Sequence, residues 1–323
     1  MATSGQSGGG SDLRTGHVLA MGLTSAGLFA SRYAAQDLGL APLVFLAAFS
    51  PLPLMAARLR SASGAVLATV IAATCVGWLG SAGDSVVFLV GMAVPGLLVV
   101  EILTRGRGLM RGAFVASAWM VSVMTILLVA NGRGLANQVL AALDDVRSPA
   151  FVAQMRSQGV SLEQVDAWTE QVATIYAALK VVYPAAFLIM GVSLVVLNAF
   201  MFRAYLARKD PGWLERGEFE RLRWPLGLTL VFVLAGAGVS WPESRPLALN
   251  TLLLVGFLFG LQGLAIVAFL AGRLIPPLLL WLAGMMLILA SPWLMYGLLA
   301  LLGLADNWID LRRWAEPPAA EGS

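Results

Sequence analysis

The sequence has few charged residues, and this shortage excludes a soluble protein. Only 12% of its 323 residues are charged, whereas ordinary globular chains carry about 25%. The 21 basic and 18 acidic side chains are too few to cover a folded particle of 34.1 kDa. Most of the exterior therefore faces a solvent other than water, and the expected solvent is a lipid bilayer.

The chain is equally poor in cysteine and histidine, and this limits its chemistry. Cys75 and His17 are the only residues of their kinds, so neither an intrachain disulfide nor a His/Cys zinc site can form. No Walker-type Gly-x-x-x-x-Gly-Lys loop, His-Glu-x-x-His or Gly-x-Ser-x-Gly motif occurs. We expect no metal and no cofactor, and we disfavour an enzyme. The basic residues lie in short gaps between apolar runs, so we also expect no nucleic-acid partner.

Long apolar runs are what the sequence does contain. Hydrophobic residues make up 59% of the chain, and the mean hydropathy is +0.82. A membrane helix needs roughly 20 largely apolar residues, which eight runs and a weaker first run supply. We predict an all-α, polytopic transmembrane helix bundle of about 8–9 spans. The runs are 16–35, 39–57, 64–82, 86–103, 112–130, 174–202, 225–240, 247–271 and 274–304.

These runs divide the chain into five parts. In the insert at 131–172, Ser161 followed by Glu163 and Gln164 predicts a helix start. We interpret this insert as a solvated connector in preference to a lid over a cavity. The parts are a disordered tail at 1–15, N-terminal membrane helices at 16–130, a non-cytoplasmic insert with a short amphipathic helix at 131–172, C-terminal membrane helices at 173–305 with a cytoplasmic linker at 203–223, and a C-terminal tail at 306–323.

Arginine and lysine positions predict the orientation. The basic gaps at Arg58 and Arg60, at 105–111 and at 203–223 alternate with poorly basic gaps, so the basic gaps and the N-terminus should be cytoplasmic. Nine spans would place Arg312 and Arg313 outside, although adjacent arginines favour the inside. Run 274–304 is either one tilted helix or a helix broken at Ser291-Pro292, and the parity of the span count stays open.

Polar residues within the apolar runs are candidate functional residues, because an ionisable group at mid-bilayer costs at least ~2.5–3.5 kcal/mol. Glu101 lies four residues before Arg105, so a local ion pair is the simpler interpretation. Lys180 can reach the outer interface, and a functional role is the minor alternative. Asn250 and Gln262 are about 18 Å apart along one helix, and packing against two neighbours is favoured over one shared ligand.

Small residues repeat every four positions in the first run, at Gly22, Ala26, Ala30 and Ala34. Such a stripe allows another helix to approach closely. Packing within the chain is the favoured interpretation, and contact with a separate membrane subunit is the alternative.

The C-terminal third carries a resemblance to a known family. Asn250, Gln262-Gly263, Gly303, Asp306, Asp310 and Arg312 resemble the motif of the DUF2232 or YybS-like family of uncharacterised bacterial multi-pass membrane proteins, with Leu311 in place of the family's aromatic residue. The resemblance implies the bacterial cytoplasmic (inner) membrane and distant kinship with substrate-binding subunits of energy-coupling-factor transporters. It gives Ala26, Ala30 and Ala34 a second interpretation as contacts for a membrane coupling subunit, with the ATPase on another chain.

Three functions are compatible with these features. The first is transport-related binding of a small-molecule ligand between helices, in a lipid bilayer and with a coupling subunit and ATPase as partners. The second is a scaffold that recruits partners through the linker 203–223 and the tail from Asp306. An intramembrane enzyme would rest on Asp306, Asp310 and Glu101 alone. For Asp306, Asp310 and Arg312, an ion-pair cluster at a helix end is weighed equally with a function.

Overall fold

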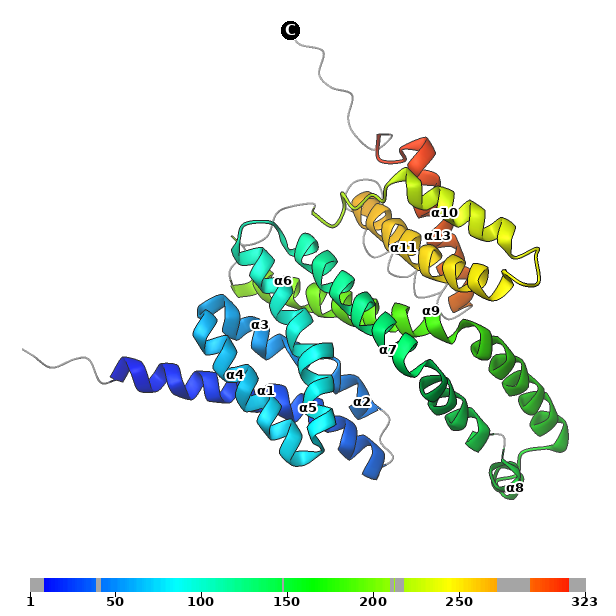
Figure 1. The fold of residues 1–323 in the computed structure, drawn as a ribbon, viewed down its shortest axis with the longest axis horizontal. Coiled ribbons are helices and arrows are strands. Elements are labelled where there is room, and N and C mark those ends of the chain that lie inside the picture. The colour runs from blue at the N-terminus through cyan, green and yellow to red at the C-terminus, as the bar shows by residue number, and fades with distance from the viewer. Residues whose placement is uncertain are drawn as a thin grey trace, which may run out of the picture. The chain divides into compact units, whose positions relative to one another are not determined.

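The computed structural model describes residues 9–38, 42–146, 148–209, 212, 218–271 and 291–313, and every regular element in these ranges is a helix (Figure 1). The predicted all-α class is confirmed. The chain divides into two compact units, which are residues 1–124 with 190–218 (unit 1) and residues 125–189 with 219–323 (unit 2). Helices α7, Leu109–Val146, and α9, Leu162–Lys209, each contribute to both units.

Unit 1 contains the first helices of the chain, the start of α7 and the end of α9. Two clusters of buried apolar side chains form its core, with Phe29 and Phe88 in one and Val100 and Phe202 in the other. The helices are α1 Gly9–Leu38, α2 Pro42–Ala47, α3 Pro51–Arg60, α4 Ala62–Leu79, α5 Ala82–Phe88, the π-helix η1 Leu89–Ala93 and α6 Val94–Thr104.

Helices α1 and α4 run side by side in the same direction. A Cβ on Gly64, near the start of α4, would lie 3.2 Å from Val18 Cγ2, and a Cβ on Gly80, just past its end, would collide with Tyr33. Between these points, a Cβ on Gly22 would lie 2.8 Å from the Ala68 carbonyl oxygen. The predicted stripe thus places Gly22 directly against the α4 backbone.

Helix α1 begins within the segment 1–15 that the sequence marks as a tail. Residues from Gly9 onward are helical, and residues 1–8 lie outside the described ranges. Run 39–57 was expected to be one span, and this is wrong. Helix α2 ends at Ala47, a turn follows, and α3 starts at Pro51 because proline fits the first helical position but not a helix interior.

The insert 131–172 continues the neighbouring helices. Helix α7 passes through a kink at Asn131 (φ −142°, ψ 32°) and ends at Val146, and α8, Pro149–Ser157, follows. The Ser161 hydroxyl accepts the Gln164 N–H and the Gln164 side chain accepts the Ser161 N–H, so the predicted helix start is correct. The helix is not short, however, because α9 continues from Leu162 to Lys209.

Unit 2 contains the rest of α7 and α9 together with α8, α10 (Leu226–Gly238), α11 (Arg245–Ala271) and α13 (Pro292–Ile309). The Tyr296 hydroxyl donates to the Leu253 carbonyl, and Gln262 bonds to Asp306 further along both helices. Helices α11 and α13 therefore run in the same direction. Ser291 caps α13, so a new helix begins at the expected Ser291-Pro292 break, while residues 272–290 lie outside the described ranges.

Five helical segments of the described chain are long and apolar enough to cross a membrane. Two shorter apolar helices accompany them, Leu226–Gly238 and Leu294–Ile309. The expectation of about 8–9 spans is thus met only in part. The long segments are Ala62–Leu79, Ala82–Thr104, Leu109–Asn131, Leu162–Lys209 and Arg245–Ala271.

Candidate functional site

Four of the predicted site residues meet where the end of α13 packs against α11 in unit 2. Asp306 is fully buried, and its Oδ2 accepts from Gln262 Nε2 at 3.2 Å and lies 3.4 Å from Arg312 Nη2. Asp306 Oδ1 accepts the Leu311 N–H, while Asp310 lies 3.6 Å from Arg223. We call Gln262, Asp306, Asp310 and Arg312, with their partners Thr229, Arg223, Trp224 and Asn307, the C-terminal polar cluster.

The partners extend this cluster to the start of α10. Gln262 Oε1 accepts the Trp224 N–H at 2.9 Å, and Arg223 donates to the Asp306 carbonyl. Asn307 accepts from Gln262 and donates to Thr229. Neither Asn307 nor Thr229 was recognised from the sequence, since single neutral polar residues in apolar runs are common. The hydrogen bonds join three helices, as buried polar networks in membranes commonly do.

Close backbone contact makes this arrangement possible. A Cβ on Gly263 would collide with the Leu299 carbonyl, and a Cβ on Gly303 would collide with the Phe259 carbonyl. Both positions require glycine because the two helix backbones touch there. This close approach brings Gln262 within reach of Asp306 and Asn307.

Charge within the cluster is balanced at short range. Arg312 has a side chain only 12% exposed, and it donates to the Leu222 carbonyl at 2.7 Å. Burial lowers the pKa of Arg312, and the Asp306 carboxylate opposes this shift. Asp310 has a left-handed backbone (φ 48°) where α13 ends, which asparagine and aspartate tolerate better than most residues. One buried nitrogen, Arg312 Nε, lacks a partner.

Asn250 lies elsewhere, at a proline in α9. Its Oδ1 accepts the Ala185 N–H at 2.8 Å, and its Nδ2 donates to the Val181 carbonyl at 2.8 Å. A regular helix would join these two backbone groups, but Pro184 disturbs the helix at this position. Asn250 therefore compensates for the disturbed backbone, as side chains do around prolines in membranes. Asn250 and Gln262 bond to different helices, which agrees with packing roles.

The remaining predicted residues are Glu101, Lys180 and the small-residue stripe. In unit 1, Glu101 pairs with Arg105 at 2.8 Å as expected and also with Arg58, whose Nε donates at 2.9 Å. Arg58 was missed because it is distant in sequence. Lys180 is exposed on α9. Of the stripe, Gly22 and Ala26 are buried while Ala30 and Ala34 are partly exposed.

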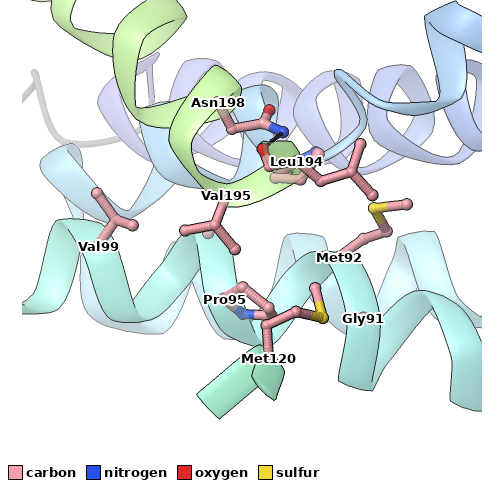
Figure 2. Close-up of a pocket in the computed structure, with 10 residues that line it drawn as sticks. Gly91, Met92, Pro95, Val99, Met120, Leu194, Val195 and Asn198 are labelled. Carbon is pink, nitrogen blue, oxygen red and sulfur yellow. Dashed lines mark hydrogen bonds between the residues drawn. The ribbon is translucent and has the colours of Figure 1, made fainter. Parts of the chain in front are cut away.

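Unit 1 contains a small cavity beside the π-helix (Figure 2). Gly91 and Met92 from η1, Pro95 from α6 and Asn198 from α9 line it. Asn198 is 4% exposed and donates to the Ala48 and Leu194 carbonyls, each at 2.8 Å, but its Oδ1 has no partner. The volume is about 10 Å³, the size of a single water site. A larger ligand does not fit there.

A much larger groove lies along α1 in unit 1. Its volume is about 930 Å³, within the roughly 300–1,000 Å³ range of ligand sites. Arg60 donates to the His17 imidazole at one end, and the Ser61 and Ser63 hydroxyls are 2.9 Å apart beside them. We call this the α1 groove, and it is lined by Thr15, His17, Val18, Met21, Ala57, Arg60, Ser61, Ser63, Gly64 and Leu67.

Two further grooves are less polar. One, of about 400 Å³, shares His17 and Met21 with the α1 groove and continues to Phe202 and Tyr205. The other, also about 400 Å³, lies in unit 2 between α11 and α13, with Tyr296 as its main polar residue. None of the three grooves was predicted from the sequence, because their lining residues are of common types and come from several helices.

The residues that the structure describes contain no group of three His, Cys, Asp or Glu side chains that could hold a metal ion. Of the acids named for an intramembrane enzyme, Glu101 belongs to unit 1, and Asp306 and Asp310 belong to unit 2.

Comparison with known proteins yields one match. The family model described as a predicted membrane protein (DUF2232) matches residues 38–307. No curated protein and no solved structure matches the chain. The matched range includes Asn250, Gln262 and Asp306 but ends before Asp310 and Arg312.

Proposed function

Since the chain belongs to the DUF2232 family of predicted membrane proteins, we propose that it is a transport-related protein of the bacterial inner membrane that binds a small molecule in the α1 groove. The α1 groove carries this proposal because it combines ligand-sized volume with polar groups at one end. Ligand sites are typically apolar with a few placed polar groups. The α1 groove has that composition, while the groove between α11 and α13 is almost wholly apolar.

The C-terminal polar cluster supports the site indirectly. Its Asp306, Gln262 and Asn307 side chains already bond to one another or to neighbouring helices. A ligand there would have to displace these bonds. We therefore assign the cluster to holding α10, α11 and α13 together and leave ligand binding to unit 1.

A matched pair of variants tests the α1 groove. Leu67 lines it and is 48% exposed, whereas the neighbouring Val66 is 63% exposed and does not line it. We expect Leu67→Trp to fill the groove and to abolish retention of a bound small molecule, measured by native mass spectrometry of the full chain in detergent. Val66→Trp should leave retention unchanged. Equal retention by both variants, or no retained molecule in the unchanged protein, would overturn the proposal.

The transport-related part implies a separate source of energy, because the sequence has no P-loop. We expect a membrane coupling subunit and an ATPase to co-purify with the tagged chain from native membranes. The small-residue stripe is a weak candidate for that contact, since Gly22 and Ala26 are already buried in unit 1. If quantitative proteomics finds neither partner enriched over a control purification of an unrelated membrane protein, the coupled-transport part of the proposal is wrong, and only the ligand-binding part stands.

The scaffold alternative has less support. In the linker, Glu218 accepts the Leu109 and Met110 N–H groups, and Arg223 donates to the Asp306 carbonyl. Both side chains bond within their own units, although Arg223 is exposed. Residues 213–217 and 314–323, on which the scaffold hypothesis also rests, lie outside the described ranges.

A further inference from the structure

The α1 groove changes from polar to apolar along its length. Because α1 and α4 run in the same direction, their lining residues occur at matching levels. His17 lies with Arg60 at one end, Val18 lies beside Gly64 at the next level, and Met21 and Leu67 follow further along the two helices. A molecule that fills the groove is therefore expected to have a polar head and an apolar tail.

The polar end carries the positive charge of Arg60. The neighbouring Arg58 pairs with Glu101, which also pairs with Arg105. Arg60, by contrast, contacts His17 and has no carboxylate within ion-pair distance among the described residues. Arginine and hydroxyl groups together suit phosphate oxygens, to which they donate charge-assisted hydrogen bonds. The head group that fits is anionic.

The predicted membrane orientation places this end at the cytoplasmic surface. The gap with Arg58 and Arg60 is one of three basic gaps, which are retained on the cytoplasmic side. Anionic lipids of the cytoplasmic leaflet attract basic groups at that depth. The second groove, which shares His17 and Met21 and is also lined by Thr24 and Tyr205, provides about 400 Å³ more space that is largely apolar.

We propose that the ligand of the α1 groove is an anionic phospholipid of the cytoplasmic leaflet. Its phosphate bonds to Arg60 and Ser63, and an acyl chain lies along Val18, Met21 and Leu67. This inference rests on the proposed function and names the class of its ligand.

The test uses the full chain in vesicles of phosphatidylcholine alone or of phosphatidylcholine and phosphatidylglycerol in equal parts. After gentle extraction, native mass spectrometry measures the retained phosphatidylglycerol. We expect Arg60→Gln to weaken its retention about tenfold, the effect of losing one charge-assisted hydrogen bond. Arg60→Lys should restore part of it. Arg107→Gln, an exposed arginine of another predicted cytoplasmic gap that does not line the groove, is the matched control.

A second variant keeps the test decisive if Arg60→Gln lowers the yield. Ser63 is exposed, so Ser63→Glu should fold, and its carboxylate should repel the phosphate and reduce retention in the same direction. If both variants retain phosphatidylglycerol as Arg107→Gln does, the lipid inference is wrong. Should Leu67→Trp still displace some other molecule in that case, the proposed function stands with a different ligand. If Leu67→Trp displaces nothing, both proposals fail.

Discussion

The two units use polar side chains in opposite ways. In unit 2, the centre of the C-terminal polar cluster is deeply buried, because Gln262 and Asp306 are fully inaccessible and bond to each other and to the backbone before α10. In unit 1, the polar end of the α1 groove is open, and Arg60 is exposed with no acidic partner among the described residues. Polar groups that bond to one another stabilise a fold, whereas accessible groups with unused donors can bind a ligand.

From the sequence, packing is favoured for Gln262, and an ion-pair cluster is weighed equally with a function for Asp306 and Arg312. The family-like motif draws attention to Gln262, Asp306 and Arg312, yet their geometry is that of a structural network. The α1 groove carries no motif at all. Residues that stand out because they are costly to bury can therefore be the ones that hold helices together.

The first prediction concerns topology, and its outcome is all-or-none. Arg312 bonds to the Leu222 carbonyl, so the end of α13 lies at the same end of unit 2 as the start of α10. In a Cys75→Ala background, we expect Arg313→Cys and Arg221→Cys to react with an impermeant maleimide from the same side of the membrane. Glu243→Cys, in the gap after α10, should react from the opposite side. Labelling of positions 313 and 221 from different sides would contradict this arrangement.

The next largest effect is expected at Asp306. Asp306→Ala leaves Arg312 and Gln262 buried without their shared acceptor, and breaking a buried pair in this way costs about 3–5 kcal/mol. Denaturant unfolding in detergent micelles measures this loss of unfolding free energy. Glu243→Ala, an exposed acid of the same unit, is the control and should change it by about 0.5 kcal/mol or less. Equal effects would mean that the C-terminal polar cluster is not structural.

The close contact between α11 and α13 predicts a smaller but comparable loss of unfolding free energy. Gly263→Ala adds a Cβ that collides with the Leu299 carbonyl, and such overpacking costs about 1–3 kcal/mol. Gly297→Ala meets no atom within 4 Å, so alanine's better helix propensity should be neutral or slightly stabilising. Melting temperatures of the two variants, compared in the same detergent, distinguish them. If Gly263→Ala leaves the melting temperature unchanged, α11 and α13 do not make this close contact.

The role of Asn250 predicts an effect that depends on Pro184. Asn250→Leu removes its bonds to Val181 and Ala185 and should cost about 1–3 kcal/mol of unfolding free energy. In a Pro184→Ala background the helix can join these backbone groups directly, so the same substitution should cost less. A double-mutant cycle measures this coupling. Purely additive effects would show that the role of Asn250 does not depend on Pro184.

Sequence patterns predicted local features better than contacts between distant segments. Hydropathy located α4, the segment Ala82–Thr104 and α11 because a run of apolar residues is a local property, and the Ser161 cap follows from residues within one helical turn. The Glu101–Arg105 pair was predictable because helix geometry sets its spacing. The Arg58–Glu101 and Gln262–Asp306 contacts join residues over 40 positions apart, which only helix packing determines. The α1 groove depends on where packing is incomplete, and no residue type marks that.

The smallest expected effect on stability is at Arg60, and it completes the comparison. Arg60 is exposed, and its loss should change the unfolding free energy by about 0.5 kcal/mol or less, far below the loss expected for Asp306→Ala. We expect Arg60→Gln to unfold like the unchanged protein in lipid-free detergent. With phosphatidylglycerol added, the unchanged protein should gain more stability than Arg60→Gln, because a ligand stabilises the form that binds it more tightly. If Arg60→Gln is strongly destabilised without lipid, Arg60 belongs to the fold, and the contrast between the two units disappears.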